Sequence, residues 1–442
     1  MMRVVVIGGG IAGLAAAVEL GAADCRVTLL EQRRVLGGRA YSLIDTTTGD
    51  AVDNGQHLFI DGFAATRRFL EAIGSADRIE FQRRFEIDFA RPGAGLARWA
   101  APDWPFPWNL AAALLRFPLI PWTDRGRALF GARQLARMLA QPPPAAQHVE
   151  EWLAALEQPE SVRAALWRPL ALAALNQDPD RAAATQFVTV LRESFGRGAA
   201  HLGTATVGLS DLFAEPAART IEAQSGRIQC GCPAQTLALA GDRVTAVITR
   251  DRDAIAADAV IAAVPPPALQ RLLPETLTRA PWCEALPVYQ PEPILSLNLW
   301  LDRAVTDQPF VGLIGTRMQW LFNKDRIMHR VPGERHAIAL VISSAQDWIG
   351  RPQADLVALA QQELATLFPA ARGARVLHAR VMKEPEATWS LPRWTTLRPL
   401  GAETPIRNLF LAGDWTDTGL PATVESAVRS GVTAARRVVD LN

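Results

Sequence analysis

Three glycines near the N-terminus have the spacing of a loop that binds a dinucleotide. They lie between an apolar β-branched run at residues 3–7 and an apolar helical run at residues 14–20. In such a loop the first glycine makes the tight turn, the second lets the backbone approach a pyrophosphate, and the third lets helix and strand pack closely. The helix N-terminus adds free N–H groups and a positive dipole end. The pattern therefore predicts a dinucleotide site formed by Gly8, Gly10, Ile11, Ala12 and Gly13.

A carboxylate follows the second predicted strand, where it can bind a ribose. The apolar run at residues 26–30 ends in Glu31, and Gln32 and Arg33 come directly after it. A glutamate at this point accepts the ribose hydroxyls of an adenosine, whereas an NADP site needs an arginine for the 2′-phosphate. A glycine-rich turn without a ligand is the alternative, but strand, helix, second strand and acid are all in register. The pattern indicates FAD or NAD.

A second glycine pair decides between these two cofactors. Gly37, Gly38 and Arg39 follow shortly after the ribose carboxylate, so that a second loop can close over the same pyrophosphate. NAD-binding domains do not need such a loop. The two motifs together resemble the FAD-binding domain of the amine oxidase and carotenoid desaturase superfamily. This resemblance implies an α/β fold, with a Rossmann-like FAD-binding domain and a second, α+β substrate domain. Rab GDP dissociation inhibitors share the architecture.

The resemblance also implies how the chain divides into domains. Residues 1–92, 205–270 and 396–442 are expected to form a discontinuous FAD-binding domain. Residues 93–204 and 271–395 are expected to form the substrate domain, with a membrane-facing helical part near 99–140. Residues 226–264 have the pattern of hairpin strands followed by a closing strand, and the backbone near Ala234 is expected to contact the adenine. Strand-like runs at 294–301 and 337–342, and an amphipathic helix at 355–367, belong to the second domain.

The C-terminal segment is expected to return to the cofactor. A short apolar strand at residues 408–412 ends in Gly413 and Asp414, and the resemblance implies that this acid bonds the ribityl chain or the pyrophosphate. The last helix begins near Ala422, Thr423 and Val424, whose amides are expected to face the N1–C2=O edge of the isoalloxazine. A helix dipole there stabilises an anionic reduced flavin. An ordinary capped C-terminal helix is the alternative.

A narrower resemblance rests on longer segments. Residues 53–57 (Asp-Asn-Gly-Gln-His) and 412–423, with further matches at 175–179, 293–301, 320–323 and 386–389, are similar to the hydroxysqualene dehydroxylase family, also called squalene-associated FAD-dependent desaturases. Ser426 departs from the pattern, where a glycine is expected. The resemblance implies reductive removal of the allylic hydroxyl of hydroxysqualene to give squalene, in the bacterial route to hopanoids. Hydride passes from N5 of reduced FAD to an allylic carbocation.

Such a reaction needs a proton donor for the departing water, a dry apolar tunnel for a long polyene, and an aromatic lining that tolerates transient positive charge. His57, with Gln56 beside it, is the predicted donor, because histidine donates protons near neutral pH. The alternative is that both side chains only hydrogen-bond the flavin or the backbone, and Gly55 and Gln56 are also expected to contact the cofactor. Asp53 is expected to cap the turn before Gly55.

The tryptophans are numerous and partly clustered. Four of the 13, Trp99, Trp104, Trp108 and Trp122, flank a proline-rich and apolar segment that arginines follow. Tryptophan on an apolar surface flanked by arginine is typical of a membrane interface, where a polyene substrate is dissolved. A buried aromatic core of the substrate domain is the alternative. The interface interpretation predicts a peripheral protein on the inner face of the cell membrane.

Composition excludes several classes of protein. A net charge of +1 offers no basic field for nucleic acid. Four scattered cysteines do not form a disulfide scaffold, and a metal site at Cys230 and Cys232 is not expected because no partner pair lies nearby. No apolar window is long enough to span a bilayer, and the N-terminus lacks a signal peptide, so a cytoplasmic location is expected.

Three rival functions are weighed against the dehydroxylase. An amine oxidase commonly uses a pair of tyrosines and a lysine–water bridge at N5, and the chain has only two tyrosines and two lysines. A carotenoid or phytoene desaturase shares the lipid tunnel and the flavin, and only an assay separates it. A non-catalytic prenyl-lipid carrier does not need the intact set of cofactor motifs. The sequence contains no second nucleotide motif, so the electron donor that reduces FAD is not identified.

Overall fold

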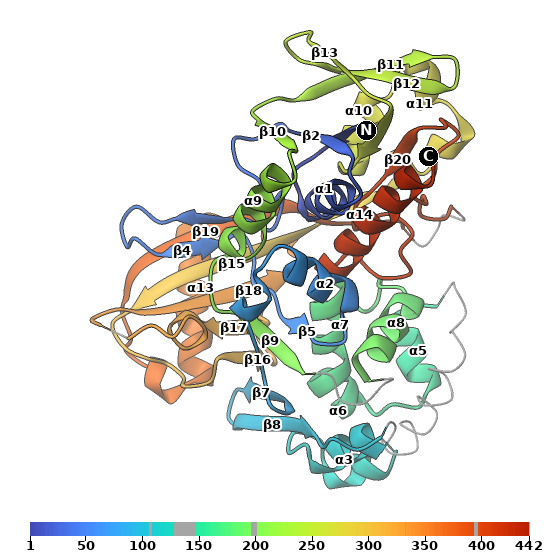
Figure 1. Cartoon of the computed structure of the whole chain (residues 1–442). Helices are drawn as coiled ribbons and strands as arrows, with labels where there is room; N and C mark the ends of the chain where they lie inside the picture. The colour runs from blue at the N-terminus through green and yellow to red at the C-terminus, as the bar shows by residue number, and fades with distance from the viewer. Residues whose placement is uncertain (106–107, 128–146, 196–200, 332, 393–396, 442) are drawn as a thin grey trace.

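The computed structural model describes residues 1–105, 108–127, 147–195, 201–331, 333–392 and 397–441. The N-terminal part is built on a five-stranded parallel sheet with the order β10-β2-β1-β14-β20. Its strands come from the beginning, middle and end of the chain: β1 (Arg3–Ile7), β2 (Arg26–Glu31), β10 (Arg227–Cys230), β14 (Ala259–Ala262) and β20 (Leu409–Leu411). The chain termini consequently lie close together at this end of the molecule (Figure 1).

Both faces of the parallel sheet are covered, which explains why its strands are continuously apolar. Val4 and Val6 of β1 pack on one face against helices α1 (Ile11–Ala22), α9 (Glu215–Ala223) and α14 (Val424–Val439). Val5 and Ile7 point to the other face. This face is covered by α10 (Pro266–Leu272) and by an antiparallel meander of β11 (Ala234–Ala240), β12 (Arg243–Thr249) and β13 (Ala254–Ala256).

The second part of the molecule is built on a seven-stranded mixed sheet with the order β19-β15-β18-β17-β16-β7-β8. Within it, β7 and β16 pair in parallel, and the other neighbours pair antiparallel. The strands are β7 (Phe85–Arg91), β8 (Gly95–Ala101), β15 (Gln290–Leu301), β16 (Phe310–Leu313), β17 (Trp320–Asn323), β18 (His336–Ser343) and β19 (Val376–Ser390). Helix α13 (Gln353–Leu367) covers one face.

Helices cover the opposite face of this sheet. Residues of α3 (Trp108–Arg116), α5 (Val149–Ala155), α7 (Arg168–Leu175) and α8 (Ala184–Phe195) share a core with β7, β8 and β17. Figure 1 shows α3 and β8 at the end of the molecule farthest from the termini. Two small antiparallel sheets, β3-β4 and β5-β9-β6, complete the strands: β3 (Ser42–Ile44), β4 (Ala51–Asp53), β5 (Phe59–Ile60), β6 (Ile79–Phe81) and β9 (Leu202–Ala205). The remaining short helices are α2 (Ala64–Ala72), α6 (Glu160–Val162), α11 (Glu275–Thr278) and α12 (Lys324–Ile327).

Most of the expected elements are present, with instructive differences. The runs at 294–301, 337–342 and 355–367 lie in β15, β18 and α13. The first strand of the 226–264 block, β10, does not form a hairpin but joins β2 in the parallel sheet. The domain boundary expected at residue 92 falls inside the β7–β8 hairpin, and both strands of this hairpin belong to the seven-stranded sheet. We therefore propose a division before residue 85. Of the helical part expected near 99–140, residues 106–107 and 128–140 lie outside the described residues.

In the described ranges, no helix is long and apolar enough to cross a bilayer. The same residues contain no cluster of three or more His, Cys, Asp or Glu side chains that could hold a metal ion.

Helices α1 and α14 approach so closely that only glycine fits at one position between them. A Cβ atom added at Gly431 lies 2.1 Å from the carbonyl oxygen of Ala12. We expect Gly431→Ala to push the helices apart and to lower the free energy of unfolding by about 1–3 kcal/mol, the usual cost of overpacking. Thermal unfolding of the purified protein measures the change. Gly401→Ala is the control, because nothing lies within 4 Å of its added Cβ; equal melting temperatures for the two variants contradict the prediction.

Candidate functional site

A cavity of about 550 Å³ runs from the C-terminal edge of the parallel sheet toward the seven-stranded sheet. Its size is within the range of small-molecule and cofactor sites. Every residue that the sequence predicts for the cofactor lines it, except Gly13: Gly8, Gly10, Ile11, Ala12, Glu31, Gln32, Arg33, Gly37, Gly38, Arg39, Gly55, Gln56, Ala234, Gly413, Asp414, Ala422, Thr423 and Val424. His57 lines it as well.

Gly13 has a packing role instead of a place in the cavity wall. It lies in the first turn of α1, where an added Cβ sits 1.9 Å from the carbonyl oxygen of Gly8. The third glycine of the motif therefore lets the helix approach the loop that precedes it, and this approach sets the distance between the helix N-terminus and the strand.

Two glycine loops form the floor of the cavity. The Gly37 N–H donates to the carbonyl of Gly9 at 2.8 Å, which ties the second loop to the first. A Cβ added at Gly38 lies 2.9 Å from the Cα of Gly10, so side chains there would fill the space between the loops. Gly8 and Gly37 have φ angles of +106° and +103°, which side chains rarely adopt. At these glycines the floor of the cavity is formed by backbone atoms. It therefore fits a pyrophosphate, which must approach backbone N–H groups closely.

Glu31 is buried at the end of β2 and is fixed by backbone donors. The N–H of Gly9 donates to one carboxylate oxygen at 2.7 Å, and the N–H of Arg33 donates to the other at 2.7 Å. Each carboxylate oxygen keeps further acceptor capacity, because a carboxylate offers about four lone-pair sites. The position suits two ribose hydroxyls, as the sequence predicts.

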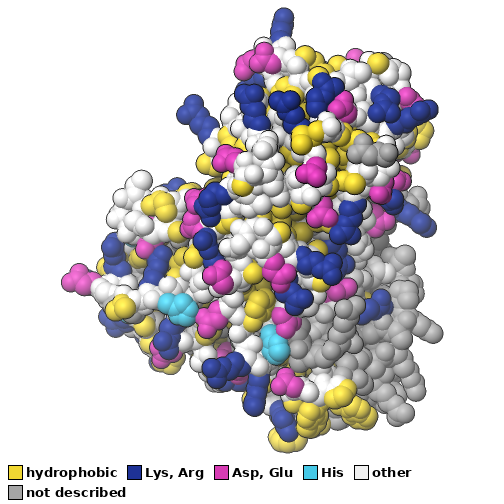
Figure 2. Space-filling view, in the orientation of Figure 1, with side chains coloured by type: hydrophobic (Ala, Val, Ile, Leu, Met, Phe, Trp, Pro, Cys, Tyr) yellow, Lys and Arg dark blue, Asp and Glu magenta, His cyan; other side chains and the backbone are white. Residues whose placement is uncertain are grey.

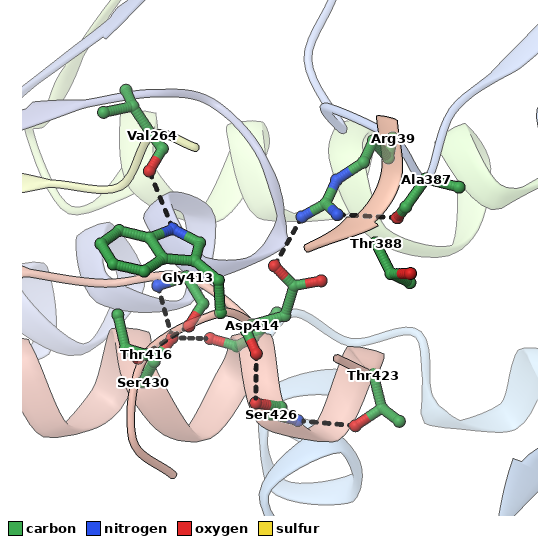
Figure 3. Close-up of polar contacts among 12 residues, drawn as sticks. Arg39, Val264, Ala387, Thr388, Gly413, Asp414, Thr416, Thr423, Ser426 and Ser430 are labelled. Atoms are coloured by element: carbon green, nitrogen blue, oxygen red, sulfur yellow. Dashed lines mark hydrogen bonds and ion pairs between the residues drawn. The ribbon is translucent and has the colours of Figure 1, made fainter. Parts of the chain in front are cut away.

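Arg39 and Asp414 connect the two ends of the chain across the cavity (Figure 3). The Arg39 guanidinium donates to the buried Asp414 carboxylate at 2.6 Å and to the carbonyl of Ala387 at 2.7 Å. The Ser426 hydroxyl donates to the Asp414 backbone carbonyl at 3.1 Å. The serine that replaces the expected glycine is thus a link between the Gly-Asp turn and the last helix.

The first turn of α14 serves both ends of the cavity. Thr423 is the N-cap, with its hydroxyl accepting from the N–H of Ser426, and Ala422, Thr423 and Val424 line the cavity where a flavin edge is expected. Glu425, the next residue, also lines the cavity and is fully buried. Its carboxylate accepts the N–H groups of Ala65 and Thr66 at 3.1 and 2.8 Å, so it caps helix α2.

Beyond the predicted flavin position the cavity is mainly apolar. Helices α7 and α8 and strands β15, β17 and β18 supply most of this wall, and the segment 58–63, which contains β5, supplies the rest. The residues are Leu58, Ile60, Phe63, Ala173, Ala174, Val190, Ile294, Trp320, Phe322 and Val341. Most of these residues come from elements far apart in the sequence, and no pattern within one segment predicts that they form a common wall. An apolar extension beside a polar cofactor floor fits a hydrocarbon ligand.

His57 and Gln56 stand at the junction of the two ends. Burial lowers the pKa of His57, while the charge of Asp53 acts in the opposite direction. The imidazole is therefore neutral at pH 7, which does not favour the proton-donor role that the sequence assigns to it. Gln56 accepts a hydrogen bond from the Lys324 ammonium at 3.3 Å. No motif in the sequence indicates this role for Lys324, although the rarity of lysine, with two in the chain, is a signal that could have found it.

Comparisons with known proteins agree with this geometry. The family described as flavin containing amine oxidoreductase matches residues 11–439. The chain belongs to this family. Hydroxysqualene dehydroxylases from Rhodopseudomonas palustris and Sinorhizobium fredii are 32% and 29% identical, over 98% and 97% of this chain and 97% and 96% of the relatives. The 15-cis-phytoene desaturase of Synechococcus elongatus is 28% identical over 99% of this chain and 96% of its own length.

Several solved structures share the fold along the whole chain. An oxidoreductase from Methanosarcina mazei superposes with a TM-score of 0.75 at 18% identity, covering 98% of this chain and 100% of the other. Cyclohexylamine oxidase from Brevibacterium oxydans gives 0.71 at 16% identity, covering 100% and 99%. These likenesses confirm the expected fold. The family confirms FAD as the cofactor, and the glycine floor and Glu31 are the parts of this chain that fit it.

Within this amine oxidoreductase family, the tyrosines of the chain are not placed as an amine cage. Tyr289 is buried and donates its hydroxyl to the carbonyl of Trp415 at 3.0 Å, and burial raises its pKa. Tyr41 packs beside Val52 and Trp300. Among the described residues that line the cavity there is no tyrosine, so the aromatic wall consists of phenylalanine and tryptophan.

The ion pair between Arg39 and Asp414 gives a direct test of the cofactor site. Asp414→Asn keeps the size of the side chain but leaves the guanidinium without its charged partner, and we expect FAD affinity to fall at least about tenfold. Flavin absorbance per protein after desalting measures the retained cofactor. Asp417→Asn is the control, because Asp417 is exposed three residues further along. Equal flavin content in the two variants contradicts the assignment.

Proposed function

We propose that the protein is an FAD-dependent enzyme that removes the allylic hydroxyl of hydroxysqualene reductively and releases squalene. The observation that carries this proposal is the apolar extension of the cofactor cavity, which starts at His57 and continues between α7, α8 and the seven-stranded sheet. A triterpene alcohol is apolar along nearly its whole length, so it matches this wall. The relative from Rhodopseudomonas palustris, at 32% identity, is named hydroxysqualene dehydroxylase.

The protein positions the substrate for this reaction and excludes water from the site. When bound and reduced, FAD supplies a hydride to the allylic carbon. The phenylalanine and tryptophan rings of the apolar wall exclude water and face the positive charge that develops as the C–O bond breaks. The N-terminus of α14 would face the flavin edge, where its dipole would stabilise negative charge on the reduced cofactor. An external donor must reduce the flavin between turnovers.

The second candidate is a phytoene-type desaturase, which runs the flavin in the opposite, oxidising direction. It is favoured by the 28% identity to the desaturase of Synechococcus elongatus over 99% of this chain. Both substrates are long polyenes, so the apolar wall accommodates either one. The two candidates differ in whether the substrate carries an oxygen and in which redox state of the flavin reacts.

The deciding experiment uses the FAD-loaded protein in both redox states. We expect the anaerobically reduced protein to convert hydroxysqualene to squalene, with the oxidised flavin spectrum returning in step with product. When the oxidised protein is incubated with phytoene, we expect no new double bonds to form in the phytoene. Gas chromatography with mass detection identifies the products. Desaturated phytoene, without squalene from the reduced protein, establishes the second candidate instead.

We further propose that the protein docks on a lipid bilayer through the end that carries α3. Trp104, Trp108 and Trp122 are 49, 68 and 80% exposed there, whereas Trp99 is fully buried in the core. Figure 2 shows hydrophobic side chains gathered at this lower end of the molecule. Arg116 lies over the Trp104 ring at 6.0 Å, and Arg125 lies over the Trp122 ring at 3.8 Å. Aromatic rings with arginines beside them fit the headgroup region.

The exposed tryptophans make this docking proposal testable. We expect the double variant Trp104→Ala, Trp108→Ala to lower the fraction that floats with anionic liposomes at least about tenfold, because two interfacial anchors are lost. Trp348→Ala is a matched control, since Trp348 also lies beside arginines, Arg317 and Arg351, but on another part of the molecule. Unchanged flotation of the double variant defeats the docking proposal.

A further inference from the structure

The buried lysine next to the flavin-facing segment has no role in the function described so far. Lys324 is the first residue of α12, directly after β17, and its ammonium lies 2.8 Å from the carboxylate of Asp53. Both side chains are almost completely buried, with 7 and 5% exposure. The two residues meet because β17 and β4 end at the same place in the fold, although they are far apart in the sequence.

Asp53 is anchored independently of the lysine. Its second carboxylate oxygen accepts the Ser42 hydroxyl at 2.7 Å and the N–H of Leu209 at 3.0 Å. The expected role as a cap of the following turn is therefore replaced by a junction of three chain segments. One oxygen is held by these two donors, and the other is left for Lys324.

Lys324 in turn fixes the orientation of Gln56. Because the ammonium donates to the Oε1 atom of Gln56 at 3.3 Å, the amide nitrogen of that side chain must point elsewhere. This Nε2 atom is buried and has no protein partner. A buried hydrogen-bond donor without a partner costs about 1–3 kcal/mol, so we expect a ligand or a water molecule to accept from this Nε2 atom.

A second, small cavity lies behind this segment. It measures about 10 Å³ and is lined by Asp53, Gln56, His57 and Lys324, with Phe322 closing one side. A cavity of this size begins to accommodate a single water molecule when polar groups surround it. Gln56, His57 and Phe322 also line the large cavity, so they form the wall between the two.

We propose that Lys324 supplies the proton that converts the leaving hydroxyl into water, through one water molecule in the small cavity and the neutral His57 imidazole, which lines both cavities and can accept a proton at one ring nitrogen while it donates from the other. The proposal rests on the proposed dehydroxylation. The C–O bond breaks with both electrons on oxygen, and the proton from the ammonium completes H2O; the hydride that reduced FAD would supply completes the balance at carbon. Lys324 regains its proton from solvent before the next turnover. Asp53 holds the lysine side chain in place in both protonation states.

The choice of a lysine at this position supports a transferable proton. Two of the 46 basic side chains in the protein are lysine, so arginine supplies positive charge nearly everywhere else. Arginine does not release its proton in proteins, whereas a buried lysine can. Two other titratable groups lie near the pair. His57 is neutral, because burial lowers its pKa. Burial raises the pKa of Asp325, but this side chain lines neither cavity, and one of its oxygens contacts the N–H of Ala337 and His336.

The test compares Lys324→Arg with Lys383→Arg in reduced holoenzyme mixed anaerobically with hydroxysqualene. Lys383 is the other lysine, exposed and bonded to the carbonyl of Arg351, so its variant is the matched control. We expect Lys324→Arg to retain FAD and to slow flavin reoxidation at least about 100-fold, the lower range for loss of a general acid. Squalene measured by mass spectrometry confirms the reaction.

A second substrate separates proton supply from structural damage. In the acetate ester of hydroxysqualene, the leaving group is acetate, which departs without needing a proton. With this ester as substrate, we expect the rate of the Lys324→Arg variant to lie within about threefold of the wild-type rate. A rate unchanged with the alcohol overturns the proposal. An equal loss with alcohol and ester also overturns it, because a purely positional role impairs both.

A further variant keeps the test valid if Lys324→Arg fails to fold. Lys324→Gln combined with Asp53→Asn removes both charges together, so no unpaired charge stays buried. We expect this protein to bind FAD, to be slow with the alcohol and to recover with the ester; the same loss with both substrates counts against the proposal. If wild-type protein makes no squalene, the proposed function fails as well. If wild-type and Lys324→Arg protein make it equally fast, only the proton assignment fails.

Discussion

The close contact between helices α1 and α14 is the constraint on which the site depends. Gly431 permits it, because the backbone of Ala12 occupies the space of a side chain at that position. The contact places the C-terminal strand β20 beside β14 and delivers Asp414 to the glycine loops of the N-terminus. A cofactor floor made only of residues 8–39 would lack Asp414 and the helix end that is expected to face the flavin. The FAD site therefore depends on tertiary contacts that bring the C-terminal segment of the chain beside the N-terminal segment.

The cofactor half of the site could be predicted because its determinants are local. A turn that needs a left-handed residue accepts glycine at Gly8 and Gly37 whatever the rest of the chain does, and Glu31 follows its strand directly. The known geometry of one βαβ unit then fixes their relative positions. Gly13 is the exception within this set, because helix packing and ligand contact both select glycine and a sequence does not separate the two reasons.

The substrate half could not be predicted in the same way. The pairing of Lys324 with Asp53 depends on how two sheets meet, and nothing within either segment encodes the partner. The tryptophan cluster shows the same limit: Trp99 alternates inward on β8 and is buried, while Trp104 and Trp108 follow where the strand has ended and are exposed. Likewise, the β7–β8 hairpin belongs to the second sheet because of a parallel pairing with β16, more than two hundred residues away.

The first turn of α14 joins two regions that are usually considered separately. Thr423 and Val424 face the flavin end of the cavity, and Glu425, between them and Ser426, caps helix α2 beside Phe63 and Thr66 at the apolar end. One helical turn thus holds a wall of each compartment. The two ends of the cavity are therefore mechanically linked, because any displacement of this turn also disturbs the cap of α2.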